Sequence, residues 1–330
     1  MTEHSEAYKK YKDIVDSILS KTITQKQPET LYKPLRYILN SGGKRIRPML
    51  VISACEGAGG KMEDAVNAAV AIELLHNFTL VHDDIMDNAD TRRGMKTIHR
   101  KWNDNVAILC GDLLIGFAYS YLMKTKSGKL DKIVKIFTDG VIEVCEGQGY
   151  DKEFENRNDV TLDEYMMMIH KKTAKLLETS AVIGALCGGA NDEKVNNIRQ
   201  YASNIGIAFQ IQDDLLDIIA DEKELGKKIG GDLVEGKKTY LLLKAMQVVK
   251  NKKDRKKIEK IASGKGLKAD NTEKIMEIKN IYERYGVLES AQNEIELYTN
   301  LADEYLYAFT DPEHQKQMRW FSEMLMGRSF

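Results

Sequence analysis

Proline is scarce in this sequence, and its distribution carries the first structural signal. The chain has only four prolines, Pro28, Pro34, Pro48 and Pro312, so none lies between positions 48 and 312. Because proline breaks helices, this long gap permits many uninterrupted helices. Strand-like alternation of polar and apolar residues is also lacking, while apolar residues recur at spacings of three and four. The sequence therefore predicts an all-α fold.

Cysteine is equally scarce. The four cysteines are widely spaced and form no CxxC pair; they are Cys55, Cys110, Cys145 and Cys187. Such spacing argues against a zinc site and against a disulfide framework. We expect reduced thiols in the core.

An excess of charge and a long apolar run are both lacking. The net charge of −1 gives no general reason to expect nucleic acid or an anionic membrane as a partner. The longest apolar stretch, 106–119, contains Asp112 and is too short to span a bilayer. The charged N-terminus has no apolar core like that of a signal peptide, so we expect a cytoplasmic protein without membrane insertion.

A lysine-rich stretch at 250–260 is the one segment that resembles a nucleic-acid contact. Acidic residues are interleaved with its lysines, and aromatic residues are absent. A solvated helix face explains this pattern better than nucleic-acid binding.

Helical periodicity extends over nearly the whole chain. Thr161 and Glu164 have the spacing of a capping box, and glycines at 188–189 and 264–266 mark helix ends. No linker or repeat divides the chain, so we expect a single domain, 1–330, built as one large helical bundle. The predicted helices are 6–20, 29–40, 47–57, 63–88, 104–124, 130–150, 161–188, 192–220, 238–250, 254–262, 271–308 and 312–326.

Two aspartate clusters with the pattern DDxxD stand at the ends of apolar helical runs. Their carboxylates are Asp83, Asp84 and Asp87 in the first and Asp213, Asp214 and Asp217 in the second. Four residues advance a helix by about 400°, so the first and last carboxylates of each cluster share one face. Like charges at this spacing repel. Chance explains one such cluster, but two favour bound Mg²⁺; calcium sites of the EF-hand type need a loop instead of a helix.

Basic residues suited to phosphate lie near both clusters. Arg92 and Arg93 follow the first cluster, and arginine forks bind phosphate oxygens in pairs. The segment GGKRIRP at 42–48 combines glycines with three cations, although an ordinary surface turn explains part of this pattern. The second cluster is accompanied by Lys172, Thr173, Gln210, Lys227, Lys228, Asp232 and Lys237. No Walker loop, GxGxxG motif or hydrolase triad is evident.

Six ordered motifs carry a family resemblance. They are GGKRIRP at 42–48, ELLHNFTLVHDDIMDNADTRRG at 73–94, GQGYD at 147–151, KKT at 171–173, FQIQDDLLD at 209–217 and GKKIGGDLVEGKKT at 226–239. In order and spacing they resemble the trans-isoprenyl diphosphate synthase family, also called polyprenyl synthetases, which includes farnesyl and geranylgeranyl diphosphate synthases. The resemblance implies the isoprenoid synthase fold, with about ten or more helices around a central cavity, and a homodimer.

The resemblance also implies roles for individual residues. Both aspartate clusters would hold Mg²⁺, three ions per active site when substrate is bound. The allylic diphosphate would be bound by Arg92, Gln148, Lys172, Thr173, Gln210, Lys227, Lys228 and Lys237, with Asp151 lining the pocket and Asp232 supporting metal-bound water or Lys237. Isopentenyl diphosphate would be bound by Lys44, Arg47, His76 and Arg93. Taken alone, His76 is equally well explained as an ordinary core histidine.

The reaction implied by the resemblance is chain elongation. The allylic diphosphate ionises, isopentenyl diphosphate attacks the resulting cation, and a proton passes to the departing diphosphate. Catalysis would depend on Asp83, Asp87, Arg92, Lys172, Thr173, Gln210, Asp213, Lys227 and Lys237. Thr173 and Gln210 would also stabilise the cation through their dipoles.

Product length would depend on the residues four and five positions before Asp83. These are Thr79, which is small, and Phe78, which is bulky, about 6–8 Å along the helix axis. One aromatic beside a small residue resembles geranylgeranyl synthases, so we expect a C20 product. The alternatives are a C15 synthase, a terpene cyclase, which would need no isopentenyl site, and a non-catalytic partner subunit, which would be expected to lose one aspartate cluster.

Overall fold

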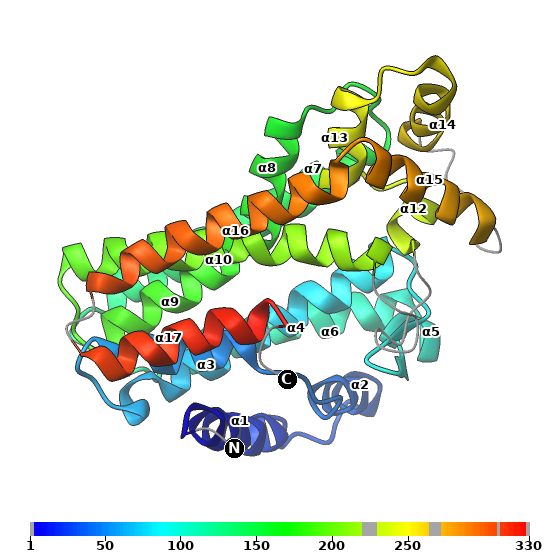
Figure 1. Cartoon of the computed structure of the whole chain (residues 1–330). Coiled ribbons are helices and arrows are strands. Elements are labelled where there is room, and N and C mark those ends of the chain that lie inside the picture. Colours follow the sequence, from blue (N-terminus) through cyan, green and yellow to red (C-terminus); the bar gives the residue numbers. More distant parts are fainter. Residues whose placement is uncertain (1–2, 220–229, 264–271, 309–310, 328–330) are drawn as a thin grey trace. The chain divides into compact units, whose positions relative to one another are not determined.

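The computed structural model describes residues 3–219, 230–263, 272–308 and 311–327. Its helices confirm the all-α prediction (Figure 1). They are α1 (Glu3–Thr22), α2 (Glu29–Leu39), α3 (Ile46–Gly57), α4 (Met62–Met86), α5 (Ile98–Lys101), α6 (Asp104–Leu122), α7 (Leu130–Glu155), α8 (Leu162–Ile169), η1 (His170–Ala174), α9 (Lys175–Cys187), α10 (Asp192–Ile219), α12 (Gly231–Glu235), α13 (Tyr240–Val248), α14 (Lys252–Ala262), α15 (Thr272–Arg284), α16 (Val287–Tyr305), η2 (Leu306–Ala308) and α17 (Pro312–Leu325).

The chain divides into two compact units. Unit 1 comprises Met1–Val141, Leu176–Arg199 and Tyr307–Trp320, and unit 2 comprises Ile142–Lys175, Gln200–Leu306 and Phe321–Phe330. The first aspartate cluster belongs to unit 1 and the second to unit 2. The prediction of a single domain, 1–330, stays a prediction.

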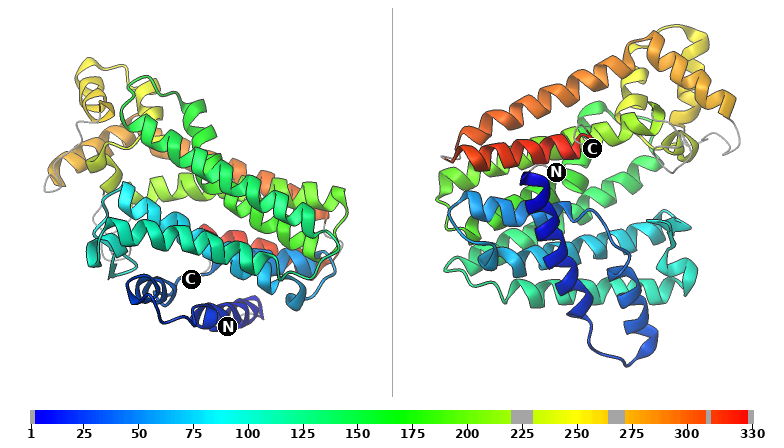
Figure 2. Two further views of the ribbon diagram at one scale, coloured as in Figure 1. Left: turned by 180° about the vertical axis from the view of Figure 1, so that it is seen from behind. Right: turned by 60° about the horizontal axis from the view of Figure 1, so that its bottom comes forward.

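Unit 1 is built on the packing of α4 against α6, which lie side by side (Figure 1). Small residues make this contact close: at Gly111 of α6, a Cβ atom would lie 2.1 Å from Nε2 of His82 on α4. Helix α3 packs on α4, while α1 and α2 lie along one side of this layer (Figure 2). The long helix α4 is thus held on several sides.

One short hairpin lies in the described part of unit 1. Strand β1 (Thr91–Arg92) pairs antiparallel with β2 (Met95–Lys96). Arg93 and Gly94 between them both have positive φ, 52° and 73°, as a type I′ turn requires. The hairpin follows the first aspartate cluster directly and so fixes where both arginines lie.

Unit 2 contains a π-helical turn that the predicted continuous helix 161–188 lacks. The segment η1 (His170–Ala174) separates α8 from α9, and it carries Lys172 and Thr173. π-turns inside α-helices occur often at functional sites. The capping box at the start of α8 is confirmed, because Glu164 N donates to Thr161 Oγ1 at 3.2 Å and Thr161 N donates to Glu164 Oε2 at 2.9 Å.

Three further predictions needed correction. The expected helix 271–308 is wrong, because Gly286 has a φ of 67° and separates α15 from α16. Cys55 and Cys110 are buried as predicted, but Cys145 is exposed and is not a core thiol. Helix α6 extends the apolar stretch 106–119 to 19 residues, which by length and composition alone would suffice to cross a membrane. One such helix is weak evidence for a membrane span, and α6 packs along α4.

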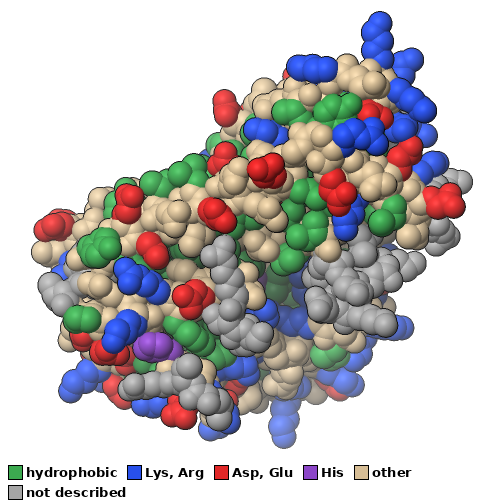
Figure 3. Space-filling view, viewed as in Figure 1, with side chains coloured by type: hydrophobic (Ala, Val, Ile, Leu, Met, Phe, Trp, Pro, Cys, Tyr) green, Lys and Arg blue, Asp and Glu red, His purple; other side chains and the backbone are tan. Residues whose placement is uncertain are grey.

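The lysine-rich segment forms α14, where basic side chains gather on the surface (Figure 3). Several of its charges are paired: Lys257 lies 2.5 Å from Glu277, and Arg255 lies 2.9 Å from Glu259. Its apolar side, with Ile258, is buried. This is the amphipathic surface helix that the sequence predicts.

Candidate active site

The first aspartate cluster lies at the C-terminal end of α4. Asp83 and Asp84 occupy its last turn, and Asp87 is the C-cap, with its N–H bonded to the Asp83 carbonyl at 2.8 Å. Carboxylates at this end of a helix oppose the helix dipole as well as one another. Their placement is unfavourable for stability alone, which favours a role in binding cations.

Arg92 of the hairpin reaches back to this cluster. Its Nε donates to Asp84 Oδ1 at 2.6 Å, and the Asp84 side chain is only 3% exposed. Burial raises the pKa of the Asp84 carboxyl, and the Arg92 charge opposes that rise. The prediction that Arg92 and the first cluster lie together is thus supported by a direct ion pair.

The segment 41–47 turns tightly at 41–45 and then enters α3. Gly42 and Gly43 have φ of 74° and 145°, and Arg45, the N-cap of α3, also has a positive φ of 51°. At Gly43 a Cβ atom would lie 3.0 Å from the Arg93 guanidinium, so glycine is what lets that arginine approach. Arg93 Nη1 donates to the carbonyl of Gly42. The turn and the hairpin therefore present their cations together.

Arg47 and His76 complete a basic group in unit 1. Arg47 Nη1 lies 3.1 Å from His76 Nε2, while Arg47 Nε is buried and has no hydrogen-bond partner among the described residues. Burial and the nearby Arg47 and Arg93 charges hold the pKa of His76 well below its usual value. Burial lowers the pKa of Arg47 to about 10, with Glu73 opposing and Arg93 adding to the effect. Lys44 is exposed on the same turn. An anion would relieve this crowding of positive charge.

The second cluster lies on α10, and Asp214 is its most enclosed member. Its oxygens accept hydrogen bonds from Tyr165 Oη at 2.5 Å, Tyr240 N at 2.9 Å and Gln210 Nε2 at 3.1 Å. Burial raises the pKa of Asp214 despite these donors. Thr173 Oγ1 in turn donates to Gln210 Oε1 at 2.7 Å. The chain from Thr173 through Gln210 to Asp214 unites three of the predicted site residues.

Asp217 binds the N-terminal end of α12. Its carboxylate accepts the N–H groups of Gly231 and Asp232, both at 3.1 Å. Burial, followed by the charges of Asp214 and Asp217, raises the pKa of Asp232. Lys237 lies 3.8 Å from Asp232 and 2.7 Å from Glu235. Asp213 is exposed beside them. Negative charge is therefore concentrated here around a single described lysine.

Helix α7 meets the π-turn at the predicted GQGYD and KKT motifs. A Cβ atom at Gly147 would lie 2.3 Å from the backbone nitrogen of Lys172, so a larger residue would separate the two segments. Lys172 Nζ forms an ion pair with Asp151 Oδ2 at 2.5 Å, and Gln148 is buried nearby in sequence. Lys227 and Lys228 lie outside the described residues.

The residues predicted to set product length lie one turn before the first cluster. The Phe78 ring packs against His82, with 4.8 Å between ring centroids, and Thr79 Oγ1 donates to the carbonyl of His76 at 2.8 Å. Both side chains are partly exposed.

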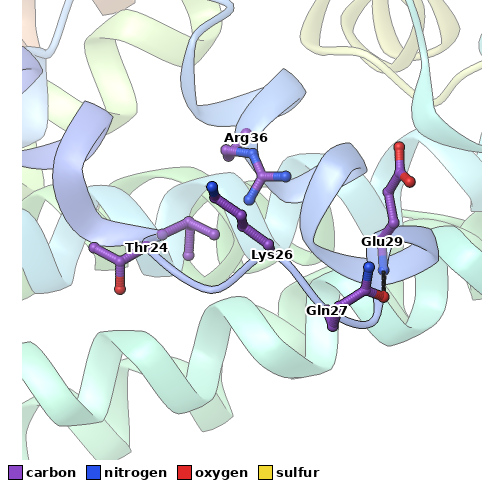
Figure 4. Close-up of a pocket in the computed structure, with 6 residues that line it drawn as sticks. Thr24, Lys26, Gln27, Glu29 and Arg36 are labelled. Carbon is purple, nitrogen blue, oxygen red and sulfur yellow. Dashed lines mark hydrogen bonds between the residues drawn. The ribbon is translucent and has the colours of Figure 1, made fainter.

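A separate surface pocket lies at the turn from α1 to α2 (Figure 4). It is lined by Ile23, Thr24, Lys26, Gln27, Glu29 and Arg36. The cation of Arg36 is engaged, because its Nη1 donates to the Gln25 carbonyl at 2.6 Å. This pocket contains none of the predicted site residues.

Magnesium is the ion that the carboxylates fit by their chemistry. Oxygen donors, raised pKa values and a shortage of nearby cations are what a hard divalent ion would offset. Within the described part of the chain, no three His, Cys, Asp or Glu side chains already stand in position to hold a metal. Magnesium typically takes only one or two carboxylates and completes its shell with phosphate oxygens and water, so the residues remain suited to it.

Some residues of the site give no signal in the sequence. Tyr165 and Tyr240 contact Asp214 from 49 and 26 positions away. Glu73 forms an ion pair with Arg45 at 2.6 Å beside the basic group of unit 1. Only folding brings these residues to the motifs.

Comparison with known proteins agrees with this chemistry. The profile of the polyprenyl synthetase family matches residues 28–281. The geranylgeranyl diphosphate synthase of Methanosarcina mazei is 45% identical over 235 residues, 71% of this chain and 72% of that protein. The short chain isoprenyl diphosphate synthase of Methanothermobacter thermautotrophicus is 35% identical over 329 residues, 99% of each chain.

Solved structures agree as well. The crystal structure of geranylgeranyl pyrophosphate synthetase from Pyrococcus horikoshii matches with a TM-score of 0.92 and 36% identity, covering 99% of this chain and 100% of that one. With the motifs, the basic group and the carboxylates in place, the chain belongs to the polyprenyl synthetase family of chain-elongating prenyltransferases.

Proposed function

We propose that this chain condenses isopentenyl diphosphate with an allylic diphosphate and releases geranylgeranyl diphosphate, C20. The observation that carries the proposal is the presence of two opposite charge excesses: the crowded arginines Arg45, Arg47 and Arg93, and carboxylates with raised pKa in the two DDxxD clusters. The crowded arginines would be stabilised by an anion, and the crowded carboxylates by cations. A substrate pair with two diphosphates and Mg²⁺ supplies both.

In this proposal, Lys44, Arg47, His76 and Arg93 bind isopentenyl diphosphate. His76, whose pKa is held well below its usual value, is neutral in this proposal and accepts from Arg47 Nη1, which orients that guanidinium while its other N–H groups face the phosphate oxygens. In this proposal the basic group binds its diphosphate through cations alone, without a metal ion.

The allylic diphosphate is the proposed ligand of the two aspartate clusters, of Arg92 and of the cations Lys172 and Lys237. Bound Mg²⁺, three ions per site, would supply positive charge to the leaving group. Asp214 accepts from Tyr165, Tyr240 and Gln210, so it also orients Gln210 within this site. Thr173 and Gln210 would stabilise the carbocation through their oxygen dipoles.

We further propose a homodimer in the cytoplasm. Helix α6 carries Ile108, Leu109 and Met123 with 43%, 56% and 58% of their surfaces exposed. Large exposed apolar side chains on one helix are typical of a surface covered by another subunit. A second copy of this chain, packed against α6, would bury them.

Product length is the sharpest test of the proposed function. Incubation with labelled isopentenyl diphosphate and farnesyl diphosphate, followed by chromatography, should yield a C20 product. Phe78→Ala removes the bulky ring at the proposed floor of the chain pocket and should shift the product to C25 or longer. A C15 end product from dimethylallyl diphosphate would support the alternative, a farnesyl diphosphate synthase; an unchanged C20 product from Phe78→Ala would place the floor elsewhere.

A further inference from the structure

Helix α1 contacts the turn 41–47 at two points, one through a charge and one through a hydroxyl. Asp16 Oδ1 lies 2.7 Å from Arg45 Nε, and Tyr8 Oη donates to the carbonyl of Lys44. We propose that α1 is a positioning element for this turn and thereby sets the affinity for isopentenyl diphosphate. This inference rests on the proposed function of Lys44 and Arg47.

Arg45 is the centre of the first contact. Its side chain is 2% exposed, and besides Asp16 it binds Glu73, which is also 2% exposed, at 2.6 Å. A buried guanidinium is stable only when its donors are satisfied. Because Arg45 also adopts a left-handed backbone conformation, φ 51°, its side-chain bonds hold the turn in a geometry that a non-glycine residue rarely adopts.

The negative charge of Glu73 acts on three arginines, and Asp16 supplies a further carboxylate to one of them. Glu73 raises the pKa of Arg45, Arg47 and Arg93, so its negative charge acts on all of them. Among these three arginines, Asp16 forms an ion pair with Arg45, and it also pairs with Lys12 at 2.7 Å. Without Asp16, Arg45 would keep Glu73 and a long hydrogen bond to the Leu39 carbonyl, and the turn before α3 would lose one of its anchors.

Tyr8 makes the second contact with the turn, and its ring also packs against the C-terminal helix α17. Its ring lies 5.9 Å from that of Trp320, which also lies 6.4 Å from His4. Burial and the Asp16 charge raise the pKa of Tyr8, so its hydroxyl stays protonated and can donate to the Lys44 carbonyl. The backbone of the cation-bearing residue is thus held directly by α1.

The test compares Asp16→Asn and Tyr8→Phe with the wild-type chain in steady-state kinetics of both substrates. Each variant should raise KM for isopentenyl diphosphate by about tenfold, the loss of one strong hydrogen bond in binding. The KM for the allylic diphosphate and the kcat should stay within about twofold. Asp16→Glu, which restores the carboxylate, should recover much of the affinity.

Asp13→Asn is the matched control, because Asp13 is exposed on the same helix. It should leave both KM values unchanged. Equal rises in both KM values, or none in a variant that melts like the wild type, would overturn the inference. If Asp16→Asn fails to fold, Tyr8→Phe removes only a hydroxyl and still gives the answer. Failure of the proposed function itself would be seen separately, as absence of isopentenyl diphosphate consumption by the wild-type chain.

Discussion

At the scale of single residues, buried charge of one sign is the feature that demands a ligand. Isolated charges are costly to bury, and crowding like charges adds to that cost. In unit 1 this cost lowers the pKa of Arg47 and of His76. In unit 2 it raises the pKa of Asp214 and of Asp232. Sites that bind charged ligands typically show such perturbation.

His76 makes this cost measurable through pH. Its folded pKa lies well below the ordinary 6.5, so the folded state binds fewer protons than the unfolded state as pH falls. The stability associated with neutral His76 is therefore present above pH 6.5 and is lost below it, at up to about 1.4 kcal/mol per pH unit for one proton. Urea unfolding between pH 7.5 and 5 should show His76→Gln losing less stability than the wild type. If the free energy of unfolding fell equally with pH in both proteins, His76 would not be the group responsible.

The motif residues of the site could be predicted because diphosphate and metal chemistry restrict both residue type and spacing. This chemistry predicts Asp83, Arg92, Lys172 and Gln210, whose roles stay predictions. Tyr165 could not be predicted, because no sequence pattern links a tyrosine to an aspartate 49 positions away. The same holds for the ion pair of Asp16 with Arg45, which joins residues 29 positions apart.

At the scale of elements, apolar periodicity predicted most helices to within a few residues. It failed where the backbone changes without a change of pattern. The π-turn at 170–174 inserts a wider turn between two α-helices, and the break before α16 occurs at Gly286, which has a positive φ. The short hairpin at 91–96 was also missed, because two-residue strands are too short for alternation.

The contact of α4 with α6 depends on a missing side chain at Gly111. Gly111→Ala places a methyl 2.1 Å from His82 Nε2, so the imidazole must move, which disturbs its packing on Phe78. We expect a loss of about 1–3 kcal/mol in the free energy of unfolding, measured by urea titration. Gly116→Ala on the same helix, where a Cβ meets no heavy atom within 4 Å, is the control and should not destabilise. The His82→Ala, Gly111→Ala double variant has room for the methyl, so an undiminished effect there would contradict this packing.

At the scale of the whole molecule, the proposed dimer interface on α6 can be tested by substitution. Leu109→Lys places a charge on the exposed apolar face of α6 and should convert dimers to monomers in sedimentation velocity at micromolar concentration. Met276→Lys replaces a similarly exposed apolar residue, 45% exposed, on α15 and should leave the mass unchanged. A wild-type monomer, or a Leu109→Lys dimer, would contradict the assignment of α6.

The role of the two aspartate clusters in binding Mg²⁺ is tested most directly by product formation, with both clusters compared under the same conditions. Wild-type chain, Asp83→Ala and Asp213→Ala are each given isopentenyl and farnesyl diphosphates, with Mg²⁺ or with chelator. The wild type should form geranylgeranyl diphosphate only with Mg²⁺, and each variant should lose at least about 100-fold in turnover while circular dichroism shows its helices intact. Near-normal turnover by either variant, or by the wild type in chelator, would contradict the claim that these carboxylates bind the metal ions of the reaction.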